Sequence, residues 1–373
     1  MKNRTVKALV LGVAMSTLMM MGTANTFAAE TEEAAAEETA GEETGDAAVE
    51  ESETEETDGD ETVEDEAAEE TDETAETDED AAEAEEHAAT GTAAEAAGEV
   101  YEPSVDPEAP KDQAILVVSF GTSFNDNRAA TIGAVENAIV EAFPDYDVRR
   151  AFTAQIIIDK LEKYDNVLID NVTEALDRAV EDGVKTLIVQ PTHLMNGLEY
   201  NDLSAELAEY ADSFDQIVLG EPLLTSDEDY KTVEEAITSA TADYDDGETA
   251  ICFMGHGTEA ESNEVYSKMQ ETLTADGYEN YYVGTVEASP TLEEVLALVQ
   301  EGDYTRVVLE PLMVVAGDHA NNDMAGDEEG TWKKTFEDAG YEVETVLDGL
   351  GSMESIQNAY VEHTQAAIDS IAE

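Results

Sequence analysis

The sequence predicts an α/β fold of two similar parallel-sheet domains, built from βα repeats, with a cleft between them. From residue 114 onward, short apolar runs alternate with amphipathic helical stretches, as in repeated βαβ units. After the turn Asp245-Asp246-Gly247 the same pattern begins again. The apolar runs of the two parts can be aligned, which indicates an internal repeat.

The N-terminus, residues 1–28, has the organisation of a secretory signal peptide. Lys2, Arg4 and Lys7 precede an apolar run at 8–21, and Thr26-Phe27-Ala28 is a plausible cleavage site. The alternative is an uncleaved membrane anchor, but the run is shorter than the roughly 20 residues of a spanning helix. We therefore expect an exported, extracytoplasmic protein, whether in a periplasm, on the cell surface or secreted.

Residues 29–110 form an acidic low-complexity segment with 35 Asp and Glu and no Lys or Arg. Such a composition buries too little apolar surface to offset its ordering entropy, so we expect a disordered, extended spacer. It could loosely concentrate cations, or it could be a solubilising or wall-spanning stalk. Both interpretations fit the composition.

The rest of the chain is also acidic. Of the 91 Asp and Glu in the whole sequence, 56 lie after residue 110, against 13 of the 16 Lys and Arg. Nucleic acid and anionic membranes are therefore poor partners, because both need basic surfaces, whereas a divalent cation fits. The single cysteine, Cys252, excludes an internal disulfide and lies in an apolar run, where we expect a buried side chain.

The first predicted domain covers residues 111–245 and the second covers residues 246–373. In the first, strands are expected at 114–120, 147–152, 185–191 and 216–222, and helices at 127–143, 156–180, 198–210 and 230–244. In the second, strands are expected at 249–255, 281–287, 306–315 and 341–347, and helices up to 273, at 290–300, at 332–339 and from 352 onward.

Aligning the halves places three pairs of side chains at corresponding strand ends: Phe120 with His256, Phe152 with Glu287, and Glu199 with His319. Ligand sites of open α/β sheets lie outside the carboxyl ends of the strands. We therefore expect one largely aromatic wall, from the first half, facing one metal-binding wall, from the second.

His256, Glu287 and His319 form a set of two imidazoles and one carboxylate, which suits Co, Fe, Ni or Zn and leaves coordination positions open. Taken alone, His256 could simply pack in its Gly-His-Gly turn. Glu199 could reach the same metal or move a proton, or it could only stabilise a helix N-terminus. His193 is a further candidate for the cleft, whereas His87 and His363 are expected to be solvated. Nucleotide-binding and GxSxG motifs are absent from the sequence.

Six motifs resemble those of the anaerobic sirohydrochlorin cobaltochelatases, across essentially all of residues 111–373. They are SFGTS (119–123), RAFT (150–153), NGLEY (196–200), MGHG (254–257), VGTVE (283–287) and VAGDHANNDM (315–324). The resemblance implies a chelatase-like fold with the active site between two α/β domains, and ATP-independent insertion of Co2+ into sirohydrochlorin or its precursor during anaerobic cobalamin biosynthesis.

By this resemblance, His256 and His319 are the catalytic and metal-binding histidines, Glu287 is the metal-binding glutamate, and Glu199 is an active-site glutamate. Co2+ is then the substrate metal, with Fe2+ or Ni2+ as alternatives, and no organic cofactor is required. Phe120 and Phe152 would stack on the flat tetrapyrrole, and His256 would accept a pyrrole proton as the metal enters.

The sequence leaves two alternatives to this function. Because tetrapyrrole synthesis is cytoplasmic, an exported member could instead be a haem- or metal-binding protein on a chelatase scaffold. The acidic segment could also be the cation store, with the folded part as its anchor. Sirohydrochlorin is a polycarboxylate, so the few cations, Arg149, Arg150 and Lys160 among them, are expected in the cleft, with Arg150 as a substrate-binding residue.

Overall fold

The computed structural model describes residues 10–11 and 112–372. The predicted signal peptide, apart from Val10 and Leu11, and the predicted acidic segment at 29–110 lie outside the described residues. Within the described part, no helix is both long enough and apolar enough to cross a bilayer.

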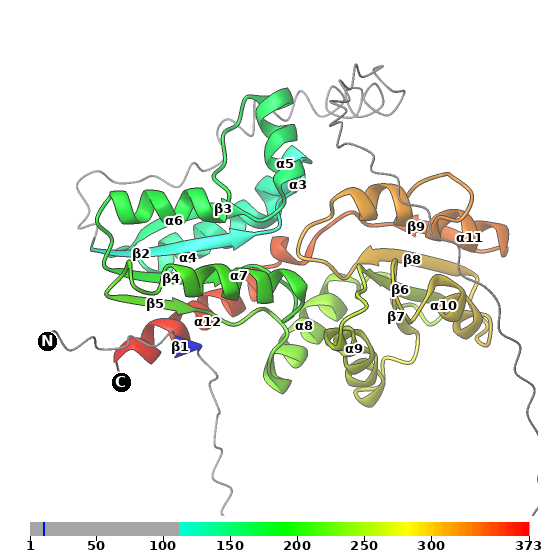
Figure 1. The fold of residues 1–373 in the computed structure, drawn as a ribbon. Coiled ribbons are helices and arrows are strands. Elements are labelled where there is room, and N and C mark those ends of the chain that lie inside the picture. Colours follow the sequence, from blue (N-terminus) through cyan, green and yellow to red (C-terminus); the bar gives the residue numbers. More distant parts are fainter. Residues whose placement is uncertain (1–9, 12–111, 373) are drawn as a thin grey trace, which may run out of the picture. The chain divides into compact units, whose positions relative to one another are not determined.

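Nine strands form two sheets in the described part, and every strand pair is parallel (Figure 1). The first sheet has the order β1 (Val10–Leu11), β5 (Gln216–Leu219), β4 (Thr186–Pro191), β2 (Gln113–Ser119) and β3 (Asp147–Phe152). The second has the order β7 (Tyr281–Thr285), β6 (Thr249–Gly255), β8 (Arg306–Pro311) and β9 (Glu342–Thr345). The predicted fold class is confirmed.

Helices connect the strands in both halves. The α-helices are α3 (Asn125–Arg128), α4 (Ala134–Ala142), α5 (Gln155–Lys160), α6 (Val172–Glu181), α7 (Leu198–Glu209), α8 (Asp227–Ala240), α9 (Glu264–Ala275), α10 (Leu292–Val299), α11 (Trp332–Asp338) and α12 (Glu354–Ala372). Shorter helical segments are η1 (Ala129–Gly133), η2 (Leu161–Asp165), η3 (Glu261–Asn263), η4 (Ala320–Met324) and η5 (Leu350–Ser352). Asn171, Ser226 and Thr291 begin α6, α8 and α10 with capping boxes, a start signal that the sequence carries.

Successive strand residues face opposite sides of each sheet, as the period of two requires. On β2, Leu116 packs with α6 and α7, whereas Ile115 and Val117 face the other way. On β6, Cys252 packs with α10 and α11, whereas Ile251 and Phe253 join the same cluster as Ile115 and Val117. One continuous apolar cluster, here called the shared core, therefore contains one face of each sheet.

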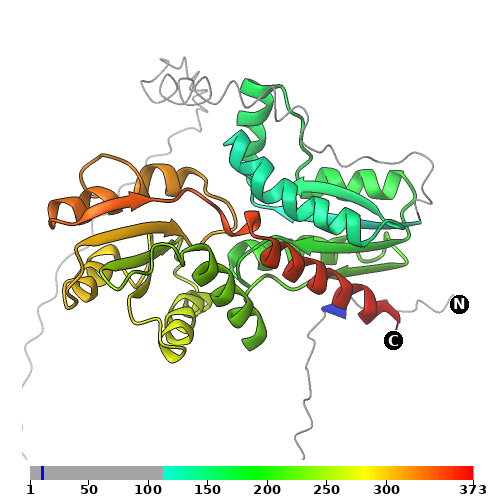
Figure 2. The same cartoon turned by 180° about the vertical axis from the view of Figure 1, so that it is seen from behind.

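Two helices connect the halves through this shared core. The closing helix α12, which was predicted as part of the second domain, packs against β4 and β5 of the first sheet and against α4 and α8 (Figure 2). Helix α8 in turn packs against α9 of the second half. Ile356 and Tyr360 of α12 are completely buried.

His363 on α12 is not solvated, contrary to expectation. Its side chain is 14% exposed, and its Nε2 lies 3.0 Å from Oδ1 of Asp229 on α8. Burial lowers the pKa of His363, but the hydrogen bond and the charge of Asp229 outweigh burial, so the pKa is raised overall. The imidazole thus binds α12 to α8.

Strand register tests the predicted alignment of the halves. Gln113 pairs with Thr186 between β2 and β4, and the aligned residues Thr249 and Arg306 pair between β6 and β8. For the second strand of each half, β3 and β7, the alignment is wrong by two residues. Phe152 pairs with Ser119, and Thr285 pairs with Gly255, the counterpart of Ser119. Phe152 therefore corresponds to Thr285, and Glu287 corresponds to Ala154.

Candidate metal centre

His256, Glu287 and His319 lie together at the carboxyl ends of three adjacent strands. His256 follows β6, Glu287 follows β7, and His319 lies in the helical turn after β8. One possible ligand atom from each residue lies within 4.8 Å of those of the other two. The side chains are 45%, 54% and 33% exposed, in that order, so a metal held here would keep coordination positions open.

Glycines on both sides of His256 allow its position. A Cβ on Gly255 would lie 2.1 Å from the ring of Tyr266, and Gly257 has φ +89° with the backbone of Ala288 beside it. Nδ1 of His256 lies 2.8 Å from the carbonyl oxygen of Gly257. Because a carbonyl only accepts, Nδ1 carries the proton in this bond and Nε2 is left as a lone-pair donor for a metal or a proton.

Glu287 is positioned by the backbone of the histidine beside it. The N–H of Glu287 donates to the carbonyl of His256 at 2.9 Å, and the N–H of Val286 donates to that of Gly255 at 3.0 Å. These bonds extend the pairing of β6 and β7 past the strand ends. They bring an Oε of Glu287 to 3.7 Å from Nδ1 of His256.

His319 is oriented by Asp323, which the sequence analysis did not identify. Nδ1 of His319 lies 2.7 Å from Oδ2 of Asp323, four residues later. The two imidazoles meet edge to face, with ring centroids 4.6 Å apart and an interplanar angle of 87°. A carboxylate on Nδ1 fixes the tautomer of a metal-binding histidine and makes Nε2 a stronger ligand. The spacing His-x-x-x-Asp within a helical turn was the available signal.

Phe120 and Glu199 come from the first half. Phe120 is 48% exposed just beyond β2. Glu199 is exposed and is the second residue of α7. In the alignment of the two halves it corresponds to His319. Its carboxylate does not belong to the three-residue cluster. A Cβ on Gly197 would lie 3.8 Å from Oε2 of Glu199 and 3.7 Å from Oγ of Ser262, so the carboxylate lies near the η3 segment of the second half.

Phe152 does not provide a stacking surface, contrary to expectation. Its side chain is completely buried, and a Cβ on Gly121 would lie 2.6 Å from its ring. The two-residue error in aligning β3 with β7 explains this, because Phe152 occupies a position within the sheet and not beyond it. Of the two predicted aromatic residues, Phe120 alone remains at the surface.

Arg150 and Arg149 are not available cations. Nε of Arg150 lies 2.7 Å from a carboxylate oxygen of the buried Glu136. Arg149 is buried and forms ion pairs with Asp147 and Asp182 at 2.7 and 2.8 Å. The prediction that these guanidinium groups meet substrate carboxylates in the cleft is therefore wrong.

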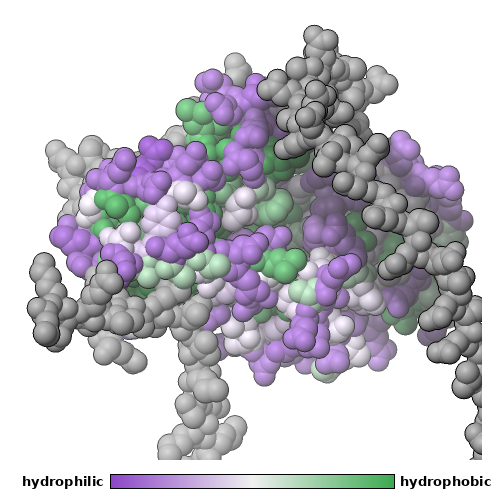
Figure 3. Space-filling view, viewed as in Figure 1, coloured by the Kyte–Doolittle hydropathy of each residue, from purple (hydrophilic) through white to green (hydrophobic). Residues whose placement is uncertain are grey.

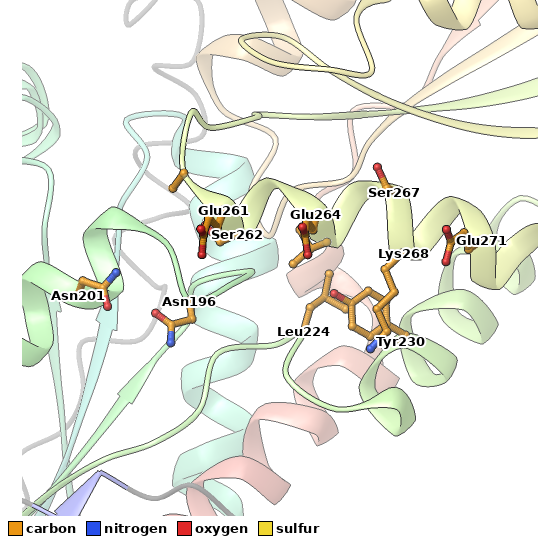
Figure 4. A pocket seen from close by; sticks show the side chains of 12 residues that line it. Asn196, Asn201, Leu224, Tyr230, Glu261, Ser262, Glu264, Ser267, Lys268 and Glu271 are labelled. Carbon is orange, nitrogen blue, oxygen red and sulfur yellow. The ribbon is translucent and has the colours of Figure 1, made fainter. Parts of the chain in front are cut away.

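The structure has a cavity of about 1040 Å3 whose lining includes none of the three residues of the metal centre. Figure 4 shows Glu261 and Glu264 on the η3–α9 segment, with Asn196 of the loop before α7 across from them. The one lysine of the lining, Lys268, pairs with Asp227 at 2.7 Å. An acidic lining of this kind repels carboxylates, so the cavity alone is a poor site for a polycarboxylate.

His193, a further candidate for the cleft, is shielded instead. Both of its ring nitrogens are inaccessible to solvent and lack a hydrogen-bond partner in the described structure. Burial lowers the pKa of His193 to about 4, although the charge of Glu199 opposes the shift. His193 is therefore neutral near pH 7.

Comparisons with known proteins agree with this geometry. The family described as "Cobalt chelatase (CbiK)" matches residues 113–369. The chain is 35% identical over 261 residues to the sirohydrochlorin cobaltochelatase of Salmonella typhimurium, covering 70% of this chain and 98% of that protein. It is 30% identical over 259 residues to the sirohydrochlorin cobaltochelatase CbiKC of Nitratidesulfovibrio vulgaris, covering 69% and 91%.

A solved structure, SirB from Bacillus subtilis with Fe3+, resembles this chain with a TM-score of 0.52 at 14% identity, covering 70% of this chain and 98% of that one. At that identity the likeness concerns the fold alone. The family match covers well over half of the sequence, including the histidine and glutamate strand ends. This chain therefore belongs to the CbiK family of cobalt chelatases.

Proposed function

We propose that this protein is a sirohydrochlorin cobaltochelatase, which inserts Co2+ into sirohydrochlorin or its precursor without ATP in anaerobic cobalamin biosynthesis. The observation that carries the proposal is the solvent-open set of His256, Glu287 and His319 in a member of the cobalt chelatase family. Both relatives described above have this activity in their names.

Co2+ is the metal we propose, delivered as a substrate. Two imidazoles and a carboxylate also accept Fe2+ and Ni2+, and availability often decides among such metals. The reaction needs no organic cofactor, because it exchanges a divalent metal for two pyrrole protons.

The first half binds the tetrapyrrole and the second half binds the metal. Phe120 offers an exposed ring against which the flat tetrapyrrole can stack, and the metal centre faces the ring from the other half. Holding both partners in one orientation supplies much of the rate gain. Nε2 of His256 accepts a pyrrole proton once it has released the metal. Glu199, near the η3 segment that follows His256, is the second proton acceptor.

A spectroscopic assay tests this function. Purified protein with Co2+ should convert sirohydrochlorin to its cobalt form faster than the uncatalysed reaction, and Fe2+ and Ni2+ should be compared in parallel. His256→Ala should abolish the acceleration, and Glu287→Gln should strongly reduce it. Glu293→Gln, which changes an exposed glutamate on α10, is the matched control. A rate equal to the uncatalysed one would reject the proposal.

The N-terminal sequence supports a second candidate, an exported haem- or metal-binding protein on this scaffold. Lys2, Arg4 and Lys7 before an apolar run are the observation that favours export. This candidate predicts stoichiometric uptake of haem or metal without turnover, weakened by His319→Ala. Cell fractionation and N-terminal sequencing of the mature protein test the export itself.

Deleting residues 29–110 separates the folded part from the acidic segment. If the segment were the functional cation store, the deletion would abolish specific metal handling. We expect the chelatase rate to be unchanged, because the ligands of the metal centre lie between residues 256 and 319.

A further inference from the structure

The loop that carries His319 is held by residues of the first half. It runs from the end of β8 to the helical turn that begins at Asp318. Val315, in the middle of this loop, packs against a cluster of first-half residues formed by Ile132, Phe152, Ile158, Leu161 and Ile169. The chain that presents a metal ligand of one half is thus anchored in the other.

A polar contact follows at the next residue. The N–H of Ala316 donates to Oδ1 of Asn127 on α3 at 2.8 Å. The Nδ2 of the same amide lies 3.4 Å from the carbonyl of Leu347, so a single side chain meets two second-half segments. Thr131 bonds the carbonyl of Asn127 at 2.6 Å, which fixes the turn that carries the amide.

The backbone between Ala316 and His319 is held by further hydrogen bonds. The side chain of Asn321 bonds the carbonyl of Gly317 at 2.8 Å, and the N–H of Asn321 bonds the same carbonyl at 3.1 Å. Only Gly317 and Asp318 separate Ala316 from His319. A shift of Ala316 would therefore move the imidazole.

We propose that Asn127 is a positioning residue for the metal centre, which fixes the His319 loop of the second half against α3 of the first. This inference rests on the proposed metal-binding role of His319. Its consequence is that the metal ligands are in place only while the two halves stay in contact at Asn127 and Val315. Metal affinity then reports on the contact between the halves.

The test is Co2+ binding by the full chain without tetrapyrrole, followed by the visible absorption bands of the bound ion. Asn127→Ala should lower the affinity about tenfold, the low end of the range for residues that orient metal ligands. Asn127→Asp keeps the acceptor for the Ala316 N–H and should retain affinity within about threefold. Both variants should lower the thermal midpoint by no more than about 4 °C, the value of about one hydrogen bond, and so stay folded at the assay temperature.

Two further variants distinguish a positioning role of Asn127 from a general loss of structure. Asn280→Ala is the matched control, because this amide bonds the carbonyl of Thr249 at 3.1 Å at the opposite end of the second sheet, and it should leave Co2+ binding unchanged. In the His319→Ala background, Asn127→Ala should cause no further loss of affinity, since it acts through His319.

The outcomes are distinguishable. Unchanged Co2+ affinity in Asn127→Ala, or an equal loss with and without His319, would overturn the inference alone. Failure of the unmodified protein to bind Co2+ would overturn both the inference and the proposed function. Co2+ binding that follows the expected pattern without chelatase turnover would overturn the chelatase function and support the inference.

Discussion

Nδ1 of His319 and Oδ2 of Asp323 lie 2.7 Å apart, which makes the carboxylate the orienting partner of a candidate metal ligand. Replacing Asp323 by Ala should lower Co2+ affinity by about 10- to 100-fold, because the imidazole loses the partner that fixes its tautomer and orientation. Asp323→Asn should lower it less, since the amide oxygen still accepts the bond. The measurement is a Co2+ titration monitored by absorption.

The control for this prediction is Asp327→Ala. Asp327 lies on the same segment but is 87% exposed and pairs with Lys333, so its loss should leave the affinity unchanged. Equal affinities for Asp323→Ala and the unmodified protein would show that His319 needs no orienting carboxylate.

Glu310 makes stability depend on pH. It is 2% exposed on β8, and burial, helped by the charge of Asp348, raises its pKa from 4.5 to about 8. The folded state holds the proton of Glu310 more tightly than the unfolded state does. The stability that this group contributes is therefore fully present below about pH 4.5 and is lost as the pH rises to about 8. The loss should reach a few kcal/mol, since one pKa unit is worth about 1.4 kcal/mol.

Glu310→Gln should remove most of this pH dependence and stabilise the protein at pH 8. The repeat supports the choice, since the counterpart of Glu310 is the buried Gln190 on β4. Urea unfolding at pH 5 and pH 8 would show the effect. Parallel pH profiles for the two proteins would contradict it.

Phe120 and Phe152 should respond to substitution in opposite ways. Phe120→Ala removes an exposed ring and should raise KM for the tetrapyrrole about threefold to tenfold, the value of one aromatic contact, without changing the thermal midpoint. Phe152→Ala opens a cavity in a buried cluster and should cost about 3 to 5 kcal/mol of stability. Steady-state kinetics and thermal unfolding of both variants check this. A stability loss in Phe120→Ala but not in Phe152→Ala would contradict the surface role of Phe120 and the core role of Phe152.

Salt should accelerate capture of the tetrapyrrole. The chain has a formal net charge of −75, and hydrophilic residues predominate on the face shown in Figure 3. Sirohydrochlorin is a polycarboxylate, so repulsion slows its approach until ions screen it, over a Debye length of about 10 Å at 0.1 M. We expect kcat/KM for sirohydrochlorin to rise about threefold to tenfold between low salt and 0.3 M NaCl.

The same series should raise KM for Co2+, because screening weakens attraction as well as repulsion. A fall in kcat/KM for sirohydrochlorin with salt would instead show that cations line the cleft. Because Arg149 and Arg150 already pair with neighbouring acids, we expect kcat/KM for sirohydrochlorin to rise with salt and not to fall.

The sequence was sufficient for the fold class and for the three-residue cluster. Alternation of apolar runs with helices fixes the βα order, and parallel strands bring their carboxyl ends to one edge. His256, Glu287 and His319 follow three strands that are neighbours in the second sheet, so their convergence needed only the strand order.

The errors arose where the sequence pattern has no resolving power. A shift by two residues keeps every strand side chain on the same face, so apolar alternation could not distinguish Phe152 opposite Glu287 from Phe152 opposite Thr285. The pairing of Arg150 could not be predicted from the sequence. Its partner Glu136 lies 14 residues earlier on a helix, and pairing across that distance depends on tertiary packing.

The path of α12 implies an order in which the molecule can be completed. Residues 354–372 of α12 pack on β4 and β5, and they follow every other described helix and strand in the sequence. Early segments of many proteins fold during synthesis, before the later ones emerge. Here part of the first sheet stays uncovered until the second half has also been translated, because α12 follows that half in the sequence.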